Sequence, residues 1–301
     1  MKLTTIPAGD ITLSAAVIAP QNPSAVVVLV HGMAEHKERY YPFMEYLAAQ
    51  GFACVIADQR GHGATASAPE DLGYFGPHGV DLLVRDCAQV IGWARAQYPG
   101  LKLFLFGHSM GSMVVRCTLK AHAALLDGLV VCGSPSPNPV AGLGIALTRL
   151  IGLFKGDRFR SKRVAMIMFG PHEKRFHVQG MHNAWLSANM DNVKAYNEDK
   201  LCGFKFTLNG YRTVMQLIQE TYSKKGWIMD KPSLPIHFIA GEEDPCIESA
   251  PVFDKAVDFL RGRGYTRVSS KLYTGMRHEI LNETDREMVW QDVNAVLQSW
   301  L

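Results

Sequence analysis

Residues Lys102-Leu-Phe-Leu-Phe106 are followed directly by Gly107-His108-Ser109-Met110-Gly111, and this stretch decides the fold. The first segment is a mostly apolar run typical of a buried strand. The second is a GxSxG motif, in which a serine stands on a sharp turn from a strand into a helix. Glycines two residues before and two after the serine leave room for the crowded backbone. We therefore expect Ser109 to be a nucleophile, with Gly107 and Gly111 supporting its turn.

Apolar runs on either side of this motif predict a sheet. Continuous runs of this kind indicate strands buried on both faces, and they occupy residues 25–30, 52–57, 129–132 and 236–240; a further strand is expected at 268–273. Helical patterns lie between them, and Thr284-Asp-Arg-Glu287 matches a capping box that predicts the start of the last helix. Alternating strands and helices predict an α/β fold with a mostly parallel central sheet flanked by helices.

The alternation breaks between residues 135 and 226. Ser134-Pro-Ser-Pro-Asn-Pro139 ends one strand, and mostly helical-looking sequence follows until Pro232 and Pro235. We expect a core formed by residues 1–134 and 227–301, with residues 135–226 as a helical insertion.

A serine nucleophile needs a base and an acid, and in this topology they follow it in the order acid, then histidine. The strand at 236–240 leads into Gly241-Glu242-Glu243-Asp244, where Asp244 has the most suitable position and the two glutamates fit a solvated turn. His278 is the one histidine after Asp244, so chain order selects it. We expect His278 to act as the base and Asp244 to orient it.

An oxyanion hole needs two backbone N–H groups close to the serine. One comes from the residue after the nucleophile, Met110. The other is expected from the loop after an early strand, His31-Gly32-Met33-Ala34-Glu35-His36, and Met33 is the candidate. Gly32 permits a close backbone approach, and His31 is expected to support the loop by hydrogen bonding.

These motifs resemble the α/β-hydrolase fold, and within it the monoacylglycerol lipase and lysophospholipase branch, often labelled serine aminopeptidase-like. The residues that carry the resemblance are 31–36, 58–63, 107–111, 241–244 and 277–279. The resemblance implies that Asp58–Gly63 is a structural loop beside the site, with Arg60 and His62 as supports. It also implies that the insertion 135–226 is a cap over the active site.

Other motifs give no indication of a cofactor or metal. Gly61-His-Gly63-Ala-Thr-Ala66 matches a dinucleotide-binding pattern, but Pro69 and Gly73 follow too closely for the helix that such a site needs. The strings that begin at His172 and His278 lack the second histidine of a zinc-binding helix. We expect no cofactor and no metal.

The net charge of +3 conceals an uneven distribution. Residues 135–226 carry 14 Lys and Arg against 6 Asp and Glu, a balance of +8, so the remaining residues carry −5. So small a total predicts no nucleic-acid partner, whereas the basic cap predicts contact with anionic lipid surfaces or substrates. No secretory signal and no apolar run long enough for a membrane span are visible, and the six cysteines form no CxxC pair. The expected location is therefore cytoplasmic, with peripheral membrane contact through the cap.

The substrate is expected to be a lipid-like ester, a monoacylglycerol or a lysophospholipid. The cap carries apolar residues at nearly helical spacing: Ile145, Leu147, Leu150, Ile151, Leu153 and Phe154. They fit either ordinary packing of the cap or an acyl-chain wall or interfacial face. The alternatives are an aminopeptidase or small-ester carboxylesterase with the same triad, and a ligand-binding, receptor-like hydrolase with slow turnover. The oligomeric state is left open.

Overall fold

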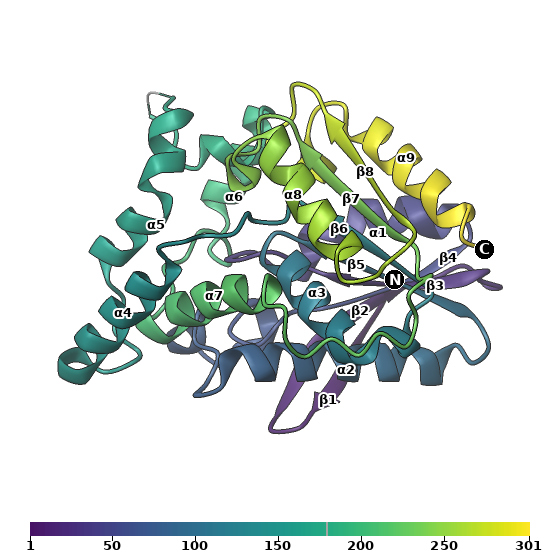
Figure 1. Cartoon of the computed structure of the whole chain (residues 1–301), viewed down its shortest axis with the longest axis horizontal. Coiled ribbons are helices and arrows are strands. Elements are labelled where there is room, and N and C mark those ends of the chain that lie inside the picture. Colours follow the sequence, from purple (N-terminus) through teal and green to yellow (C-terminus); the bar gives the residue numbers. More distant parts are fainter. Residues whose placement is uncertain (179) are drawn as a thin grey trace.

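The computed structural model of the chain describes residues 1–178 and 180–301 and contains an eight-stranded sheet (Figure 1). The strands are β1 (Lys2–Ala8), β2 (Ile11–Ile18), β3 (Ala25–Val30), β4 (Phe52–Ala57), β5 (Lys102–His108), β6 (Gly128–Cys132), β7 (Ile236–Gly241) and β8 (Val268–Tyr273). Their order is β1-β2-β4-β3-β5-β6-β7-β8. Strands β1 and β2 pair antiparallel with their neighbours, and the other pairs are parallel. The predicted α/β class is confirmed.

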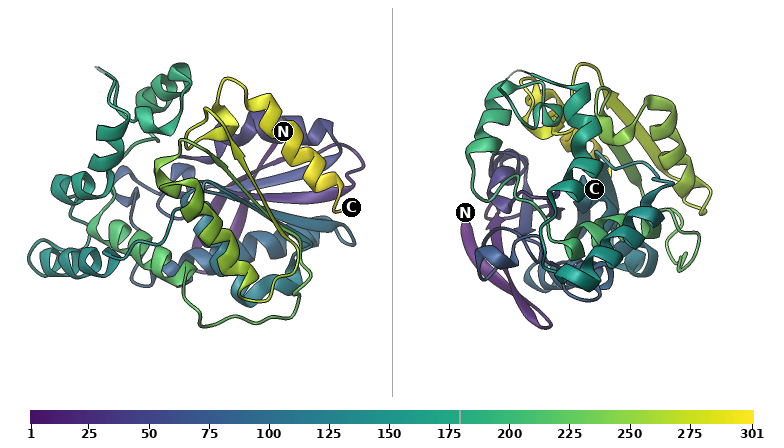
Figure 2. Two further views of the ribbon diagram at one scale, coloured as in Figure 1. Left: turned by 45° about the horizontal axis from the view of Figure 1, so that its top comes forward. Right: turned by 90° about the vertical axis from the view of Figure 1, so that its left-hand side faces the viewer.

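Helices cover both faces of this sheet (Figure 2). They are α1 (Tyr41–Ala49), α2 (Gly79–Gln97), α3 (Met110–His122), α4 (Ala141–Lys155), α5 (Lys162–Arg175), α6 (Met190–Glu198), α7 (Leu208–Thr221), α8 (Ala250–Arg261) and α9 (Arg286–Gln298). Apolar residues of α2, α3 and α8 form a core on one face, and those of α1 and α9 form a second core on the other. The sheet is therefore a middle layer between two layers of helices.

The central strands are continuous apolar runs because both of their faces are covered. All residues of β3, β4 and β7 are buried. In a parallel sheet with helices on both sides, alternate side chains enter opposite cores, so no polar face is needed. The carboxyl ends of β3, β5 and β7 consequently open at one edge of the sheet, where ligands bind in open α/β folds.

Residues 135–226 contain α4, α5, α6 and α7, which lie between β6 and β7 in the chain. Helix α7 packs against α2, α3 and α4, and its apolar residues join the first core. Helices α4 and α5 extend away from the sheet (Figure 1). We propose that this segment is a distinct cap on a core formed by residues 1–134 and 227–301, and that α7 attaches the cap to the core by packing against α2 and α3.

Two details concern the helices themselves. Helix α9 begins at Arg286, and within the described residues no side chain caps its first turn, so the predicted capping box at Thr284 is wrong. The carboxylate of Glu283 instead accepts hydrogen bonds from the backbone of Arg277 and Ala188, which holds the preceding loop outside the helix.

No helix in the described ranges combines the length and apolar character that crossing a membrane requires.

Candidate active site

Ser109 stands at the turn between β5 and α3, with φ 53° and ψ −118°. This positive φ is unfavourable for a residue with a side chain, so the surrounding structure must hold it in place. A Cβ atom on Gly107 would lie 2.5 Å from the carbonyl oxygen of Gly111. One on Gly111 would lie 2.2 Å from the carbonyl oxygen of Val30. The turn therefore requires glycine at both positions, as the motif predicts.

Three side chains meet at the carboxyl edge of the sheet. The Oγ of Ser109 lies 2.8 Å from Nε2 of His278, and Nδ1 of His278 lies 2.9 Å from Oδ2 of Asp244. Ser109 follows β5, Asp244 follows β7 and His278 follows β8, so three loops at one edge supply the group. His278 and Asp244 are buried, whereas Ser109 is half-buried. The structure thus brings together the three residues selected from chain order.

Hydrogen bonding distinguishes Asp244 from the two glutamates before it. Its Oδ2 faces His278, and its Oδ1 accepts the backbone N–H of Cys246 at 2.8 Å. Glu242 and Glu243 are exposed at the turn. A carboxylate with both oxygens engaged has a fixed orientation, which lets it select the tautomer of His278 with a proton on Nδ1.

The two expected oxyanion donors lie on either side of Ser109 in the fold. Met110 is the first residue of α3, and the first N–H groups of a helix have no partner within it. Met33 lies in the turn after β3, and in the described ranges its N–H donates to no backbone or side-chain acceptor. Gly32 lies against the elbow, since a Cβ placed there would be 3.1 Å from Cβ of Ser109.

Two buried imidazoles hold the loop that carries Met33. His62 Nε2 accepts the backbone N–H of Ala34 at 3.2 Å, and His31 Nε2 accepts that of Gln59 at 2.9 Å. Accepting a hydrogen bond requires an unprotonated nitrogen, so both rings are neutral. Burial lowers the pKa of His62 to about 3 and also lowers that of His31. The structure therefore places His31 and His62 as supports of this loop.

The sequence did not indicate a buried ionic cluster beneath the site. Arg39 contacts both carboxylates of the cluster: its Nη1 lies 2.8 Å from Glu35 and 2.6 Å from Glu279. His108, next to the nucleophile, faces Glu35 and Tyr40. These residues come from three separate segments, at 35–40, 108 and 279, so spacing could not reveal the cluster. The one available signal was the number of charged and histidine residues in the motifs at 31–36 and 277–279.

The cap supplies an aromatic roof that the sequence also did not indicate. Trp185 lies in η5 (Ala184–Leu186), and its ring centroid is 5.3 Å from that of His278. On the other side, Phe169 stacks on Trp185 and His172 lies 5.3 Å from it, both from α5. Burial lowers the pKa of His172, which favours a neutral ring. The base is thus enclosed by the cap.

Two groups of side chains combine atom types that bind metals. His36, Asp199 and Cys202 form one group, and Asp244, Cys246 and His278 form the other, with ligand atoms within 4.8 Å of one another in each. In the second group His278 is hydrogen-bonded to Asp244 through Nδ1 and to Ser109 through Nε2. In the first, His36 is hydrogen-bonded to Asp199 and Glu38. All six cysteines are free, and Cys246 is half-buried beside the acid.

Comparison with known proteins agrees with this geometry. The sequence profile of a family described as serine aminopeptidase, S33, matches residues 21–285. The chain belongs to the serine aminopeptidase, S33, family. Its resemblance to α/β-hydrolases, predicted from the motifs, is therefore confirmed, and the matched range includes the elbow and the loops that carry Asp244 and His278.

Two curated relatives and one solved structure extend the similarity over almost the whole chain. It is 24% identical over 283 residues to a monoacylglycerol lipase of Mycolicibacterium smegmatis, covering 93% of this chain and 90% of that one. It is 25% identical to phospholipase YtpA of Bacillus subtilis, covering 93% and 97%. A thermostable carboxyl esterase from Bacillus coagulans, crystallised with glycerol, superposes with a TM-score of 0.89 at 27% identity, covering 99% and 98%. These S33 relatives place the chain among serine ester hydrolases.

Proposed function

We propose that this serine ester hydrolase cleaves the carboxylic ester of a monoacylglycerol or a lysophospholipid through an acyl-enzyme on Ser109. The observation that carries the proposal is the continuous chain of hydrogen bonds from Ser109 Oγ to His278 and from His278 to Asp244. Ser109 stands on a strained turn, and among the described residues the N–H groups of Met33 and Met110 beside it have no protein acceptor. The relatives named as a monoacylglycerol lipase and a phospholipase support the choice of lipid esters.

The reaction follows from the roles of these groups. His278 Nε2 takes the Ser109 proton as Oγ attacks the ester carbonyl, and Asp244 stabilises the resulting imidazolium. The N–H groups of Met33 and Met110 hold the oxyanion of the tetrahedral intermediate. As that intermediate collapses, His278 returns the proton to the leaving alcohol, and the acyl group remains on Ser109. A water molecule, deprotonated by His278, then attacks the acyl-enzyme and releases the fatty acid. No cofactor takes part in this scheme.

The substrate class is tested by acyl-chain length and head group together. Turnover of monoacylglycerols and p-nitrophenyl esters from C2 to C16 is compared under identical conditions, with 1-acyl-lysophospholipids of the same chains. Higher kcat/KM for C8 to C16 chains than for C2 supports the proposal. A sharp preference for C2 contradicts the lipid substrate and favours a small-ester carboxylesterase. Turnover of aminoacyl amides above that of esters would favour an aminopeptidase.

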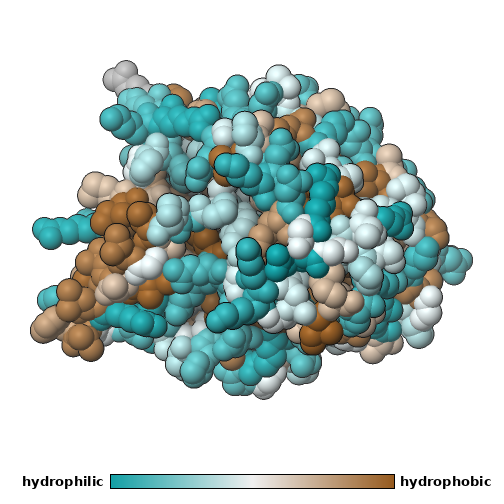
Figure 3. Space-filling model, viewed as in Figure 1, coloured by the Kyte–Doolittle hydropathy of each residue, from teal (hydrophilic) through white to brown (hydrophobic). Residues whose placement is uncertain are grey.

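We also propose that α4 and its basic neighbours seat the cap on an anionic lipid surface. Ile145 in α4 is buried, but Leu147, Leu150, Leu153 and Phe154 are exposed, and the last two are each 81% exposed. Ordinary cap packing, one of the two interpretations of these residues, is thus wrong for most of them. Exposed Met166 and Ile167 of α5 extend the apolar face. Figure 3 shows the apolar surface gathered where α4 lies in Figure 1.

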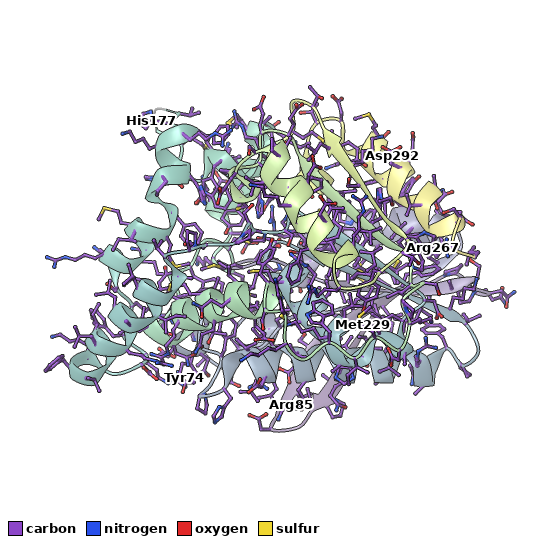
Figure 4. The ribbon with its side chains drawn as sticks, viewed as in Figure 1. Tyr74, Arg85, His177, Met229, Arg267 and Asp292 are labelled. Atoms are coloured by element: carbon purple, nitrogen blue, oxygen red, sulfur yellow. The ribbon has the colours of Figure 1, made fainter. Side chains whose placement is uncertain are left out.

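Basic side chains border this apolar face. Lys155, Lys162 and Arg163 are exposed, and within the described ranges they pair with no acid. Arg158 is held in the fold, since it pairs with Asp71 at 2.9 Å and lies 4.0 Å over the ring of Tyr74, labelled in Figure 4. An apolar helix face flanked by unpaired cations is typical of a surface that binds anionic membranes. A monomeric soluble protein seldom exposes such a continuous patch without a use for it.

The membrane proposal is tested with vesicles. Leu153→Ser combined with Phe154→Ser is expected to weaken co-sedimentation with vesicles containing anionic lipid, and to leave turnover of a soluble butyrate ester unchanged. Ile228→Ser is the matched control, because Ile228 is 55% exposed and lies outside the cap. Equal binding of wild type and the double variant, or equal binding to neutral and anionic vesicles at low salt, would contradict the proposal.

A further inference from the structure

The histidine that precedes the nucleophile has both ring nitrogens directed at acceptors. Nε2 of His108 lies 3.1 Å from the backbone carbonyl oxygen of His278, which can only accept a hydrogen bond. Nδ1 lies 3.0 Å from the hydroxyl of Tyr40 and 3.3 Å from Oε1 of Glu35. Tyr40 donates its own proton to Glu35 at 2.8 Å, so it presents a lone pair to His108. Both nitrogens of His108 must therefore carry hydrogen, which makes the ring an imidazolium.

The charges in this cluster balance only if His108 is protonated. Glu35 and Glu279 are two buried carboxylates, and Arg39 supplies one positive charge to both. A protonated His108 supplies the second, and an unbalanced buried charge is strongly unfavourable. The titratable groups that face His108 directly are Glu35 and Tyr40 at Nδ1 and the ring of His278, whose centroid lies 4.8 Å away. Arg39 and Glu279 line the same small pocket. Burial opposes a charged ring, yet the hydrogen bond and charge of Glu35 raise the pKa of His108.

Glu35 connects this cluster to the oxyanion loop. Its Oε1 accepts the backbone N–H of Gly32 at 2.5 Å, and a Cβ on Gly32 would lie 2.6 Å from the same oxygen. Gly32 directly precedes Met33, the expected oxyanion donor. The second oxygen of Glu35 pairs with Arg39, which also binds both oxygens of Glu279, the residue after His278. The carboxylate of Glu35 therefore contacts the oxyanion loop at Gly32, the elbow residue His108, and Arg39, which binds the residue after the base.

We propose that Glu35, paired with a protonated His108, is a positioning residue that holds the oxyanion loop, the nucleophile elbow and the His278 loop at fixed distances from one another. Neither residue touches the reacting atoms. The inference rests on the proposed ester hydrolysis by Ser109, and it adds the protonation state of His108 as a requirement for turnover. Turnover requires a neutral His278 and a charged His108. Rates should therefore fall at alkaline pH, as His108 loses its proton.

Glu35→Gln tests this directly. The amide oxygen can still accept from Gly32, but the negative charge of Glu35 that faces His108 is lost. Displacement of catalytic groups by a fraction of an ångström costs large factors in rate, so kcat is expected to fall about tenfold or more. KM and the melting temperature should stay close to the control. Glu38→Gln is that control, because Glu38 lies on the same loop but contacts His36 and Lys37 rather than the elbow. Its kcat should remain within about twofold of wild type.

His108→Gln and the double variant complete a thermodynamic cycle. If the two residues act through each other, the loss in the double variant is much smaller than the product of the two single losses. The alkaline limb of the kcat–pH profile should move to lower pH in Glu35→Gln and should disappear in His108→Gln. A purely structural role would lower the melting temperature and would not move that limb.

Each outcome decides the question. Wild-type kcat in Glu35→Gln, a loss equal to that in Glu38→Gln, additive single losses or an unchanged alkaline limb would overturn the proposal. If Glu35→Gln does not fold, His108→Gln decides alone: a folded variant with the wild-type kcat and pH profile overturns it. Ser109→Ala, measured in parallel, distinguishes failure of the proposed function from failure of the Glu35 proposal. If the wild-type turnover survives in Ser109→Ala, the proposed function fails; if it does not, and Glu35→Gln is unaffected, only this inference fails.

Discussion

The indole of Trp185 lies over the imidazole of His278, with ring centroids 5.3 Å apart at an interplanar angle of 40°. The cap thus contacts the base directly. Trp185 is 8% exposed, and in the described ranges its Nε1–H has no hydrogen-bond acceptor. Trp185 therefore contributes through the packing of its apolar ring. Its N–H adds no hydrogen bond, so a phenyl ring could replace it.

This relationship predicts different outcomes for two substitutions of Trp185. Trp185→Phe keeps an aromatic roof and removes an unpaired buried donor, so the free energy of unfolding should change by less than about 1 kcal/mol. Trp185→Ala leaves a cavity beside His278 and should cost about 3 kcal/mol or more. Urea unfolding of both variants measures these values. A Trp185→Phe variant as unstable as Trp185→Ala would show that the indole N–H has a partner.

The nucleophile elbow predicts a sharp contrast between two glycines. Gly111→Ala places a methyl group 2.2 Å from the carbonyl oxygen of Val30, so the backbone of two elements must move. We expect a loss of about 3 kcal/mol or more, together with loss of turnover. Gly92→Ala in the middle of α2 is the control, since nothing lies within 4 Å of the added carbon.

Alanine exceeds glycine in helix propensity, so Gly92→Ala should stabilise the protein by about 0.5–1 kcal/mol. Thermal unfolding and p-nitrophenyl butyrate turnover of the two variants provide the comparison. A stable, active Gly111→Ala protein would rule out the close approach of α3 to β3.

Neutral buried His62 predicts a pH dependence of stability. Burial lowers its pKa from the model-peptide value of 6.5 to about 3, so the unfolded chain binds a proton there that the folded chain does not. The contribution of His62 is therefore fully present above pH 6.5 and is lost as the pH falls toward 3. The slope is on the order of 1.4 kcal/mol per pH unit.

His62→Gln isolates this contribution, because an amide oxygen can still accept the N–H of Ala34 but does not titrate. Urea unfolding of wild type and variant at pH 4, 5, 6 and 7.5 gives the difference in unfolding free energy. As the pH falls, the wild type should lose more unfolding free energy than His62→Gln does. A constant difference across this range would mean that His62 is not neutral in the folded protein.

Much of this fold follows from local sequence pattern. The six predicted strands are all present. The central ones could be recognised because buried parallel strands need continuous apolar residues, whereas β8 lies at the edge of the sheet and has exposed polar residues. The hairpin of β1 and β2 was not predicted. Its alternating residues, such as Thr4 and Ile6, resemble loop sequence until the pairing of β2 with β4 is known. The last helix does begin within Thr284–Glu287, at Arg286, but the predicted capping hydrogen bonds are absent from the described residues.

The candidate site divides in the same way. Ser109, Asp244 and His278 could be selected because strand order fixes which loops meet at one edge. The cluster of Glu35, Arg39 and Glu279 could not, since the contact of Arg39 with Glu279 joins segments separated by 240 residues. Trp185 belongs to the cap, whose path over the core depends on packing that no period in the sequence encodes. The exposure of Leu153 and Phe154 was likewise undecided from helical spacing alone.

The central claim is that Ser109 is the nucleophile of an ester hydrolase. Its most direct test is the turnover of p-nitrophenyl butyrate by purified Ser109→Ala, measured against wild type after both proteins show the same far-UV circular dichroism and melting temperature. Loss of a triad nucleophile lowers kcat by on the order of 10⁴-fold or more, and we predict a loss of that size. A correctly folded Ser109→Ala protein that keeps most of the wild-type turnover would contradict the claim.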